Sequence, residues 1–249
     1  MKKLSSCLLL LAMLLSACGS TALQTSQSTP APAIDQPKEQ VASSPSPTPE
    51  PVIIYDALYE SGTYTDDVGN SYPYLLRIPA IKAPGADATR LNQEVFTALY
   101  PYVADTQKAM AGGFSLEVHT VDYDIHINEQ LISLVCRVHN DWGQTFYHTV
   151  NFDAGSYSEL TRPEILLRFG LTEDSFLSRA QSVMEGYFME HFSSVPHDAF
   201  YSDRHDNSIA EQNFREDCQL FVNDSGQLCM IVKVYSFAGA DYYYRIMEL

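Results

Sequence analysis

Alternating apolar and polar residues mark three consecutive strands in the middle of the chain, over 114–128, 131–140 and 144–152. Polar turns at 128–130 and 141–143 join them. In the first run one face is polar and the other apolar, as in a half-buried strand. The polar face carries Thr120, Asp122, Asp124, His126 and Asn128, and the apolar face carries Val121, Tyr123, Ile125 and Ile127. The pattern predicts an antiparallel meander with one face open to water.

Two other stretches have the spacing of amphipathic helices. The first covers about 87–100 and is expected to kink or end at Pro101, because proline removes a helical hydrogen bond. The second follows Thr172, whose hydroxyl and acidic successors suit a helix start. Its apolar stripe is expected to cover the dry face of the sheet.

Further strands are predicted at 72–78, ended by Pro79, and at 218–222, 228–237 and 242–247 near the end of the chain. The order of strands and helices indicates an α+β fold. We expect an antiparallel sheet with two main amphipathic helices packed on one face.

Composition divides the chain into three parts. Residues 1–17 have a basic start and a short apolar core, which is typical of a signal peptide. Residues 18–51 are rich in Pro, Ser and Thr and have almost no large apolar side chains, so they predict a disordered tether. Residues 52–249 are long enough to bury a sizeable core and are expected to form one domain outside the membrane.

Leu15-Ser16-Ala17-Cys18-Gly19 resembles the lipobox of bacterial lipoproteins. The resemblance implies that Cys18 is acylated and becomes the new N-terminus, which would anchor the protein to the outer face of the cell membrane. Two alternatives are an ordinary cleaved signal peptide, with Cys18 there by chance, and a transmembrane stub. No later stretch is apolar for the eighteen residues that a spanning helix needs.

The net charge of the chain limits the classes of molecule that it is expected to bind. With 15 basic and 31 acidic residues the formal net charge is −16, and removal of Lys2 and Lys3 with the signal peptide makes it more negative. Nucleic acid is excluded, since its binding depends on Lys and Arg contacts to phosphate. A basic protein or a cation would be attracted. The simpler interpretation is that the acidity keeps the domain soluble.

Three cysteines follow Cys18: Cys136, Cys218 and Cys229. Cys218 and Cys229 flank a predicted turn on neighbouring strands, so a disulfide between them is one expectation. Three buried thiols that act as small apolar side chains are the other.

The densest polar cluster spans 197–206. Within it His197, Asp203 and His205 carry the residue types that bind zinc or other divalent cations, but their spacing matches no established motif. A solvated loop is the preferred interpretation. No cofactor is predicted.

Two more features are candidate sites. Asp122, Asp124 and His126 form a polar row that would suit acid–base hydrolysis, although exposed strands often carry such rows. Tyr242, Tyr243 and Tyr244 are candidate ligand-binding residues, because tyrosine suits sugar faces and protein partners. Tyrosines are also good strand formers, and this interpretation is preferred.

Several segments together resemble a known extracytoplasmic domain. They are Tyr72-Pro73, a helix with Asn92, the run LISLVCRVHNDWGQTFYHTVNFDAGS, and the hairpin FVNDSGQLCMIVKVYSFAGADYYYRI. The arrangement is similar to the domain of unassigned function shared by RsiV-type anti-sigma factors and PdaC-type peptidoglycan deacetylases. The chain has a lipobox in place of the transmembrane helix of the former, and no deacetylase domain as in the latter.

The resemblance implies a non-enzymatic binding or sensor module in the cell envelope. Its partner would be a cell-wall component or a basic protein. The alternative function is a metal-dependent hydrolase of envelope material that uses the 197–206 cluster. A third possibility is a structural lipoprotein without a small ligand.

Overall fold

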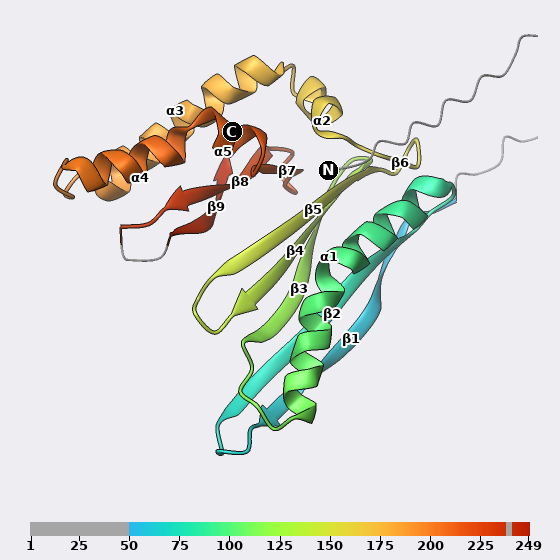
Figure 1. Ribbon diagram of the computed structural model, residues 1–249. Helices are drawn as coiled ribbons and strands as arrows, with labels where there is room; N and C mark the ends of the chain where they lie inside the picture. Colours follow the sequence, from blue (N-terminus) through green and yellow to red (C-terminus); the bar gives the residue numbers. More distant parts are fainter. Residues whose placement is uncertain (1–49, 238–240) are drawn as a thin grey trace, which may run out of the picture. The chain divides into compact units, whose positions relative to one another are not determined.

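The computed structural model describes residues 50–237 and 241–249, which belong to the compact unit Thr48–Leu249. The predicted signal peptide, Cys18 and nearly all of the tether lie outside the described residues. The α+β class is confirmed. The structure has two sheets where the sequence predicted one, and each has its own helices (Figure 1).

The larger sheet has six strands in the order β1-β2-β3-β4-β5-β6. All neighbours are antiparallel except β2 and β3, which pair in parallel over two residues only. The strands are β1 Ile53–Thr65, β2 Ser71–Lys82, β3 Val118–Asn128, β4 Leu131–Asn140, β5 Thr145–Asp153 and β6 Ser158–Glu159. The meander β3-β4-β5 is confirmed, and β1 was not predicted.

Helix α1 (Ala86–Ala111) connects β2 to β3 and lies along one face of this sheet (Figure 1). The expected end at Pro101 is wrong: the helix continues for ten residues beyond it. Val103 is fully buried, in helical register with Leu99, so packing against the sheet outweighs the hydrogen bond lost at the proline. Pro79 likewise does not end its strand. It lies opposite Asp56, where a bulge shifts the pairing of β1 and β2.

The smaller sheet has the order β7-β8-β9 and is antiparallel, as the sequence predicted for the end of the chain. Its strands and the helices before it are β7 Gln219–Val222, β8 Leu228–Tyr235, β9 Tyr242–Glu248, α2 Arg162–Arg168, α3 Glu173–Phe192, α4 Ala199–Ile209 and α5 Glu211–Arg215. Thr172 caps α3 as predicted. The buried side chains of α3 pack with those of the small sheet, so this helix does not cover the meander.

The small sheet covers part of the polar face of the meander, so this face is less open to water than predicted. A small apolar cluster joins Val135 to Phe221, Cys229 and Ile231. Beside it the fully buried Ser133 hydroxyl accepts a hydrogen bond from the Val222 N–H at 3.1 Å. Polar residues of the meander thus satisfy the backbone of β7.

A second group of hydrogen bonds joins the same two sheets. The Gln219 side chain accepts from the Thr149 N–H and donates to the Tyr147 carbonyl, both at 2.8 Å. The Asn151 amide donates to the Leu220 carbonyl at 2.9 Å. Amide side chains therefore pair with backbone groups that would otherwise lack partners.

The three cysteines are free and buried. Cys218 packs in the core between the small sheet and α3, whereas Cys229 faces the large sheet. The disulfide alternative is wrong, because the two thiols lie on opposite faces of the hairpin. In the described part of the chain no helix is long and apolar enough to cross a membrane.

Candidate functional site

An open pocket with a volume of about 590 Å³ lies at the C-terminal end of α1. It is lined by the last turns of α1, the connection to β3, and the turn between β4 and β5 with its strand ends. The surface is mostly apolar, and four aromatic side chains contribute to it: Tyr102, Phe114, Trp142 and Phe146. The volume is in the range of small-molecule sites, about 300–1,000 Å³.

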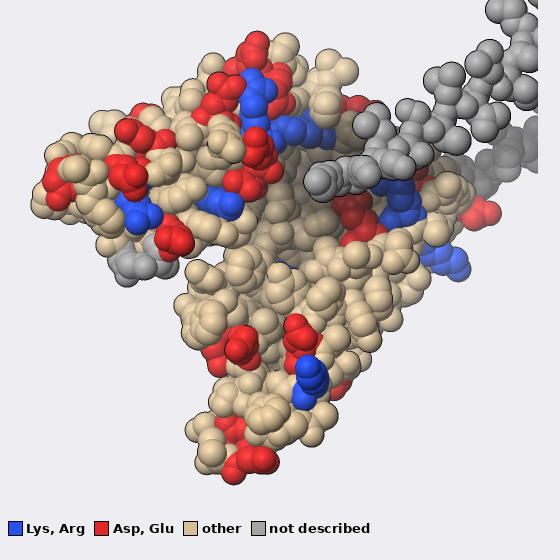
Figure 2. Space-filling model, in the orientation of Figure 1, with Lys and Arg blue, Asp and Glu red and all other residues tan. Residues whose placement is uncertain are grey.

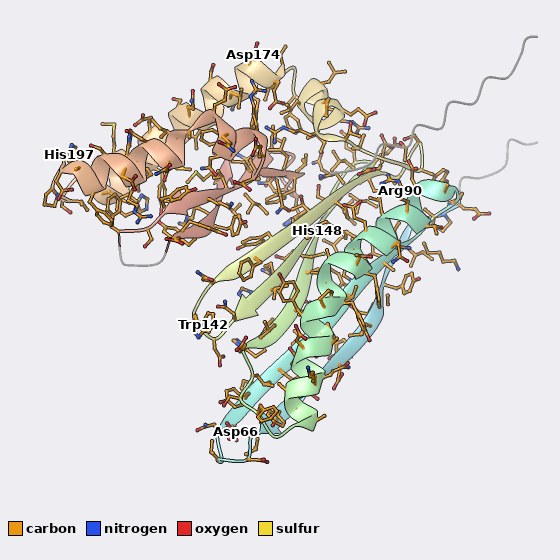
Figure 3. All side chains as sticks on the ribbon, viewed as in Figure 1. Asp66, Arg90, Trp142, His148, Asp174 and His197 are labelled. Atoms are coloured by element: carbon orange, nitrogen blue, oxygen red, sulfur yellow. The ribbon has the colours of Figure 1, made fainter. Side chains whose placement is uncertain are left out.

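Trp142 stands at the β4–β5 turn with 77% of its surface exposed (Figure 3). The Asn140 side chain holds this turn, since its oxygen accepts hydrogen bonds from the N–H groups of Trp142 at 3.1 Å and Gln144 at 2.9 Å. The Asp141 N–H donates to the Glu117 carbonyl at 2.9 Å and ties the turn to the connection before β3. The indole ring is thus presented by a well-supported backbone.

Phe114 lies on the connection after α1 and is 67% exposed. Its N–H donates to the Ala109 carbonyl at 3.0 Å. Gly113 before it has a φ of 75°, and a Cβ atom there would come within 2.2 Å of the Asp67 carboxylate. At this positive φ a residue with a Cβ atom would be strained and would displace the Asp67 side chain, so glycine is favoured in the backbone before Phe114.

The other two rings form the inner wall. Tyr102 and Phe146 stack with ring centroids 6.4 Å apart and an angle of 18°, and both pack against the core of the large sheet. The buried Thr106 hydroxyl lies 2.8 Å from the Tyr102 carbonyl and 3.0 Å from that of Val118. It therefore joins α1 to β3 behind the pocket.

Several polar side chains line the pocket, and we call four of them its rim: Asp105, Lys108, Glu117 and Gln144. None of these four side chains makes a hydrogen bond or an ion pair with another described residue. The pocket thus combines exposed ring faces with donors and acceptors that are available to a ligand.

The residues of the metal hypothesis are not brought together. His197, Tyr201 and His205 form a stacked column with spacings of 4.2 Å and 5.9 Å between ring centroids. Residues 199–209 form helix α4, capped by Asp198, so the preferred solvated loop is wrong. His197 precedes this helix, and its ring lies one turn below Tyr201 because the positions are four residues apart.

The ring nitrogens of His205 lie 2.9 Å from Glu185 and 3.1 Å from Asp206. Burial alone would lower the pKa of His205, but its hydrogen bonds to the two carboxylates outweigh this and raise it. Asp203 contacts its helix neighbours Arg204 and Asn207. Among the described residues there is no group of three or more His, Cys, Asp and Glu placed to hold a metal ion.

The two carboxylates of the polar row on β3 form ion pairs with arginine side chains. Asp122 forms an ion pair of 3.1 Å with Arg77, and Asp124 forms one of 2.9 Å with Arg137. His126 stacks on Phe221 of the small sheet. Both carboxylates of the proposed acid–base row are thus engaged in ion pairs with arginines of the same sheet.

The three consecutive tyrosines of β9 point to alternate faces. Tyr242 packs on the Lys233 ammonium at 4.6 Å, and Tyr244 meets Tyr147 of the large sheet edge to face. The Tyr243 hydroxyl lies 3.0 Å from that of Tyr187 on α3, and burial, followed by this contact, raises its pKa. Tyr243 and Tyr244 therefore join the small sheet to α3 and to the large sheet, and the three tyrosines do not line one surface.

Sequence reasoning missed the pocket residues, although one signal was present. Trp142 is the single tryptophan of the chain, and it occupies the turn Asp141-Trp142-Gly143. Because loops often carry functional residues, the tryptophan in this turn was the available signal.

No protein-family model matches the sequence, and no curated protein matches it. Among solved structures, a member of the DUF3298 family from Bacteroides fragilis is similar, with a TM-score of 0.38 and 9% sequence identity. The similarity covers 80% of this chain and 90% of that one.

Proposed function

We propose that the chain is a lipid-anchored protein of the cell envelope and a non-enzymatic binding module for a cell-wall component. The observation that carries the binding role is the pocket at the end of α1, with Trp142 and Phe114 exposed at its mouth. Two exposed aromatic rings that gather at one apolar pocket are typical of an interaction site, and aromatic rings commonly provide binding energy there.

The lipid anchor is supported by the sequence around Cys18. Its test is mass spectrometry of the membrane-extracted protein. We expect an acylated Cys18 as the first residue, and a Cys18→Ser variant should lose membrane association. An unmodified N-terminus, or unchanged membrane association of the variant, would contradict the anchor.

The binding role is tested by co-sedimentation with purified peptidoglycan. The processed chain without its lipid, residues 19–249, should be enriched in the pellet over an unrelated protein of equal negative charge. Binding should persist at high salt, since the proposed contacts are mainly apolar and uncharged. No enrichment over the control would overturn the proposal. Retention of lysozyme in place of peptidoglycan would favour the basic protein that the sequence leaves as the other partner.

A further inference from the structure

We propose that the pocket at the end of α1 binds an uncharged pyranose oligosaccharide, with sugar rings stacked on Trp142 and Phe114. The inference rests on the proposed wall-binding function and gives the chemistry of its ligand. Three features support it: the exposed aromatic faces, the polar groups of the rim that have no described partner, and the negative charge of the protein.

The aromatic side chains provide the apolar contacts. Trp142 and Phe114 come from different segments, and each exposes most of its surface at the mouth of the same pocket. The stacked pair Tyr102 and Phe146 forms the inner wall. A pyranose ring has an apolar face of C–H groups and an equatorial belt of hydroxyls, which matches a flat ring bordered by polar groups.

The rim provides the hydrogen bonds that such a ligand needs. Asp105 and Glu117 offer carboxylate acceptors for sugar hydroxyls, and Lys108 and Gln144 offer donors. Because no described residue occupies these side chains, a ligand would not have to break existing contacts. A purely apolar ligand such as an acyl chain would leave them without partners on binding.

A second, shallower surface lies along the first half of α1, beside His148 of β5, and it differs from the pocket. Arg90 contacts both Glu94 and Glu159, and His148 lies 3.4 Å from Glu94. Its charged groups Arg90 and Glu94 already lie against one another and against neighbouring side chains. This contrast favours the pocket at the C-terminal end of the helix as the ligand site.

The negative charge of the protein favours uncharged wall polymers over anionic ones as ligands. The rim has two carboxylates and one ammonium group, and the chain as a whole has a formal net charge of −16. The face in Figure 2 shows acidic groups spread over several elements. A polyphosphate chain would be repelled by this field, whereas an uncharged glycan would not.

The single tryptophan allows a direct test, because all tryptophan fluorescence of the chain arises at the pocket. The processed chain is titrated with tri-N-acetylchitotriose, with short poly(glycerol phosphate) and with lauric acid. We expect a saturable blue shift and protection from acrylamide quenching with the trisaccharide alone. No change with this or other uncharged oligosaccharides at millimolar concentration would overturn the inference, as would a saturable response only to the polyphosphate or the fatty acid.

Variants test the assignment by calorimetry, which does not depend on the fluorophore. Phe114→Ala and Glu117→Gln should each weaken trisaccharide binding at least tenfold. Tyr59→Ala, on β1 with the ring 62% exposed, is the matched control and should bind as the parent does. Because Phe114 and Glu117 are exposed, both variants are expected to fold, which circular dichroism checks. Unchanged affinity in both would overturn the inference.

The outcomes also separate this inference from the proposed function. If a Trp142→Ala, Phe114→Ala double variant still sediments with peptidoglycan as the parent does, the wall is bound elsewhere and only the pocket assignment fails. If the parent itself does not sediment, the proposed function fails first.

Discussion

The side chain of Asn92 on α1 pairs with the backbone of Ile81 on β2 as a neighbouring strand would. Its oxygen accepts from the Ile81 N–H at 2.7 Å, and its amide donates to the Ile81 carbonyl at 2.8 Å. Strand β2 pairs with β3 only at Leu75 and Leu76, so its later residues have no strand on that side. The helix therefore supplies the missing partner through one amide.

Replacing this amide should destabilise the domain. Asn92→Ala leaves the N–H and carbonyl of Ile81, a residue only 3% exposed, without partners. We expect a loss of about 1–3 kcal/mol in the free energy of unfolding, measured by urea denaturation. Gln93→Ala is the control, since Gln93 is exposed and bonds only within the helix. Equal stability of the two variants would contradict the role of Asn92.

Arg77 joins three strands with one guanidinium group. It contacts Asp56 on β1, and Asp122 and the Tyr123 hydroxyl on β3, each at 3.1 Å. Lysine keeps the charge but lacks the planar fork, so Arg77→Lys should lower stability by about 1–3 kcal/mol. Arg179→Lys, at an exposed position without such contacts, should change it by less than about 0.5 kcal/mol. Equal urea midpoints for the two would contradict the bridging role.

The thiols should be unreactive in the folded protein. Burial raises the pKa of Cys136 and Cys218 to about 12 and that of Cys229 to about 11. A thiol reagent at pH 8 should therefore label none of the three in the native state and all of them in urea. Reducing agent should leave the unfolding midpoint unchanged. A lower midpoint on reduction would reveal a disulfide and contradict the structure.

Asp153 should make stability depend on pH on the acid side. Its burial alone would raise the pKa, but hydrogen bonds from Arg168 and the N–H groups of Ser156 and Gly155 outweigh this and hold the pKa below 3.8. A carboxyl with a lowered pKa in the folded state stabilises the protein above its unfolded pKa, and this is lost as the pH falls through the folded value. Parent and Asp153→Asn should thus differ most near neutral pH.

The control for this titration is Asp174→Asn, whose side chain is 94% exposed. Its stability should follow that of the parent across the acid range. A difference between parent and Asp153→Asn that grows as the pH falls below 3.8 would contradict the assignment.

Much of the secondary structure was visible in the sequence where one face of an element is buried. Strand β3 and helices α1 and α3 show this pattern and were predicted, as were β5 and the almost wholly buried β4. Strand β1 was not, because it lies at the edge of the sheet and most of its residues are exposed. Helix α4 lacks an apolar stripe, and only Ser208 is buried in it.

Tertiary contacts explain the other differences between the predicted and the observed structure. Ser133 and Asn151 look like solvent-facing polar residues, yet they bond to the backbone of β7, about seventy or more positions later in the chain. The proline at 101 has a helix-breaking signal that only packing overrides. In each case the deciding partner is distant in sequence, so local pattern cannot reveal it.

The candidate site was also missed because its residues are distant from one another in the sequence. The sequence drew attention to 197–206 because its polar residues are adjacent, and in the structure they are spread along a helix. The pocket gathers residues from three separate segments, and neither Phe114 nor Trp142 was recognised. The tryptophan in the hairpin turn Asp141-Trp142-Gly143 was the one local signal of the pocket.

The length of α1 has a consequence for how the domain can be approached. The described chain starts beside the first turn of this helix, where the Tyr157 hydroxyl donates to the Glu50 carbonyl at 2.8 Å and Ile53 pairs with Lys82. The helix has 26 residues and at 1.5 Å per residue extends about 39 Å, with the pocket at its other end. The described chain therefore enters the domain at one end of α1, and the pocket opens at the opposite end, so the whole length of the helix separates the two places.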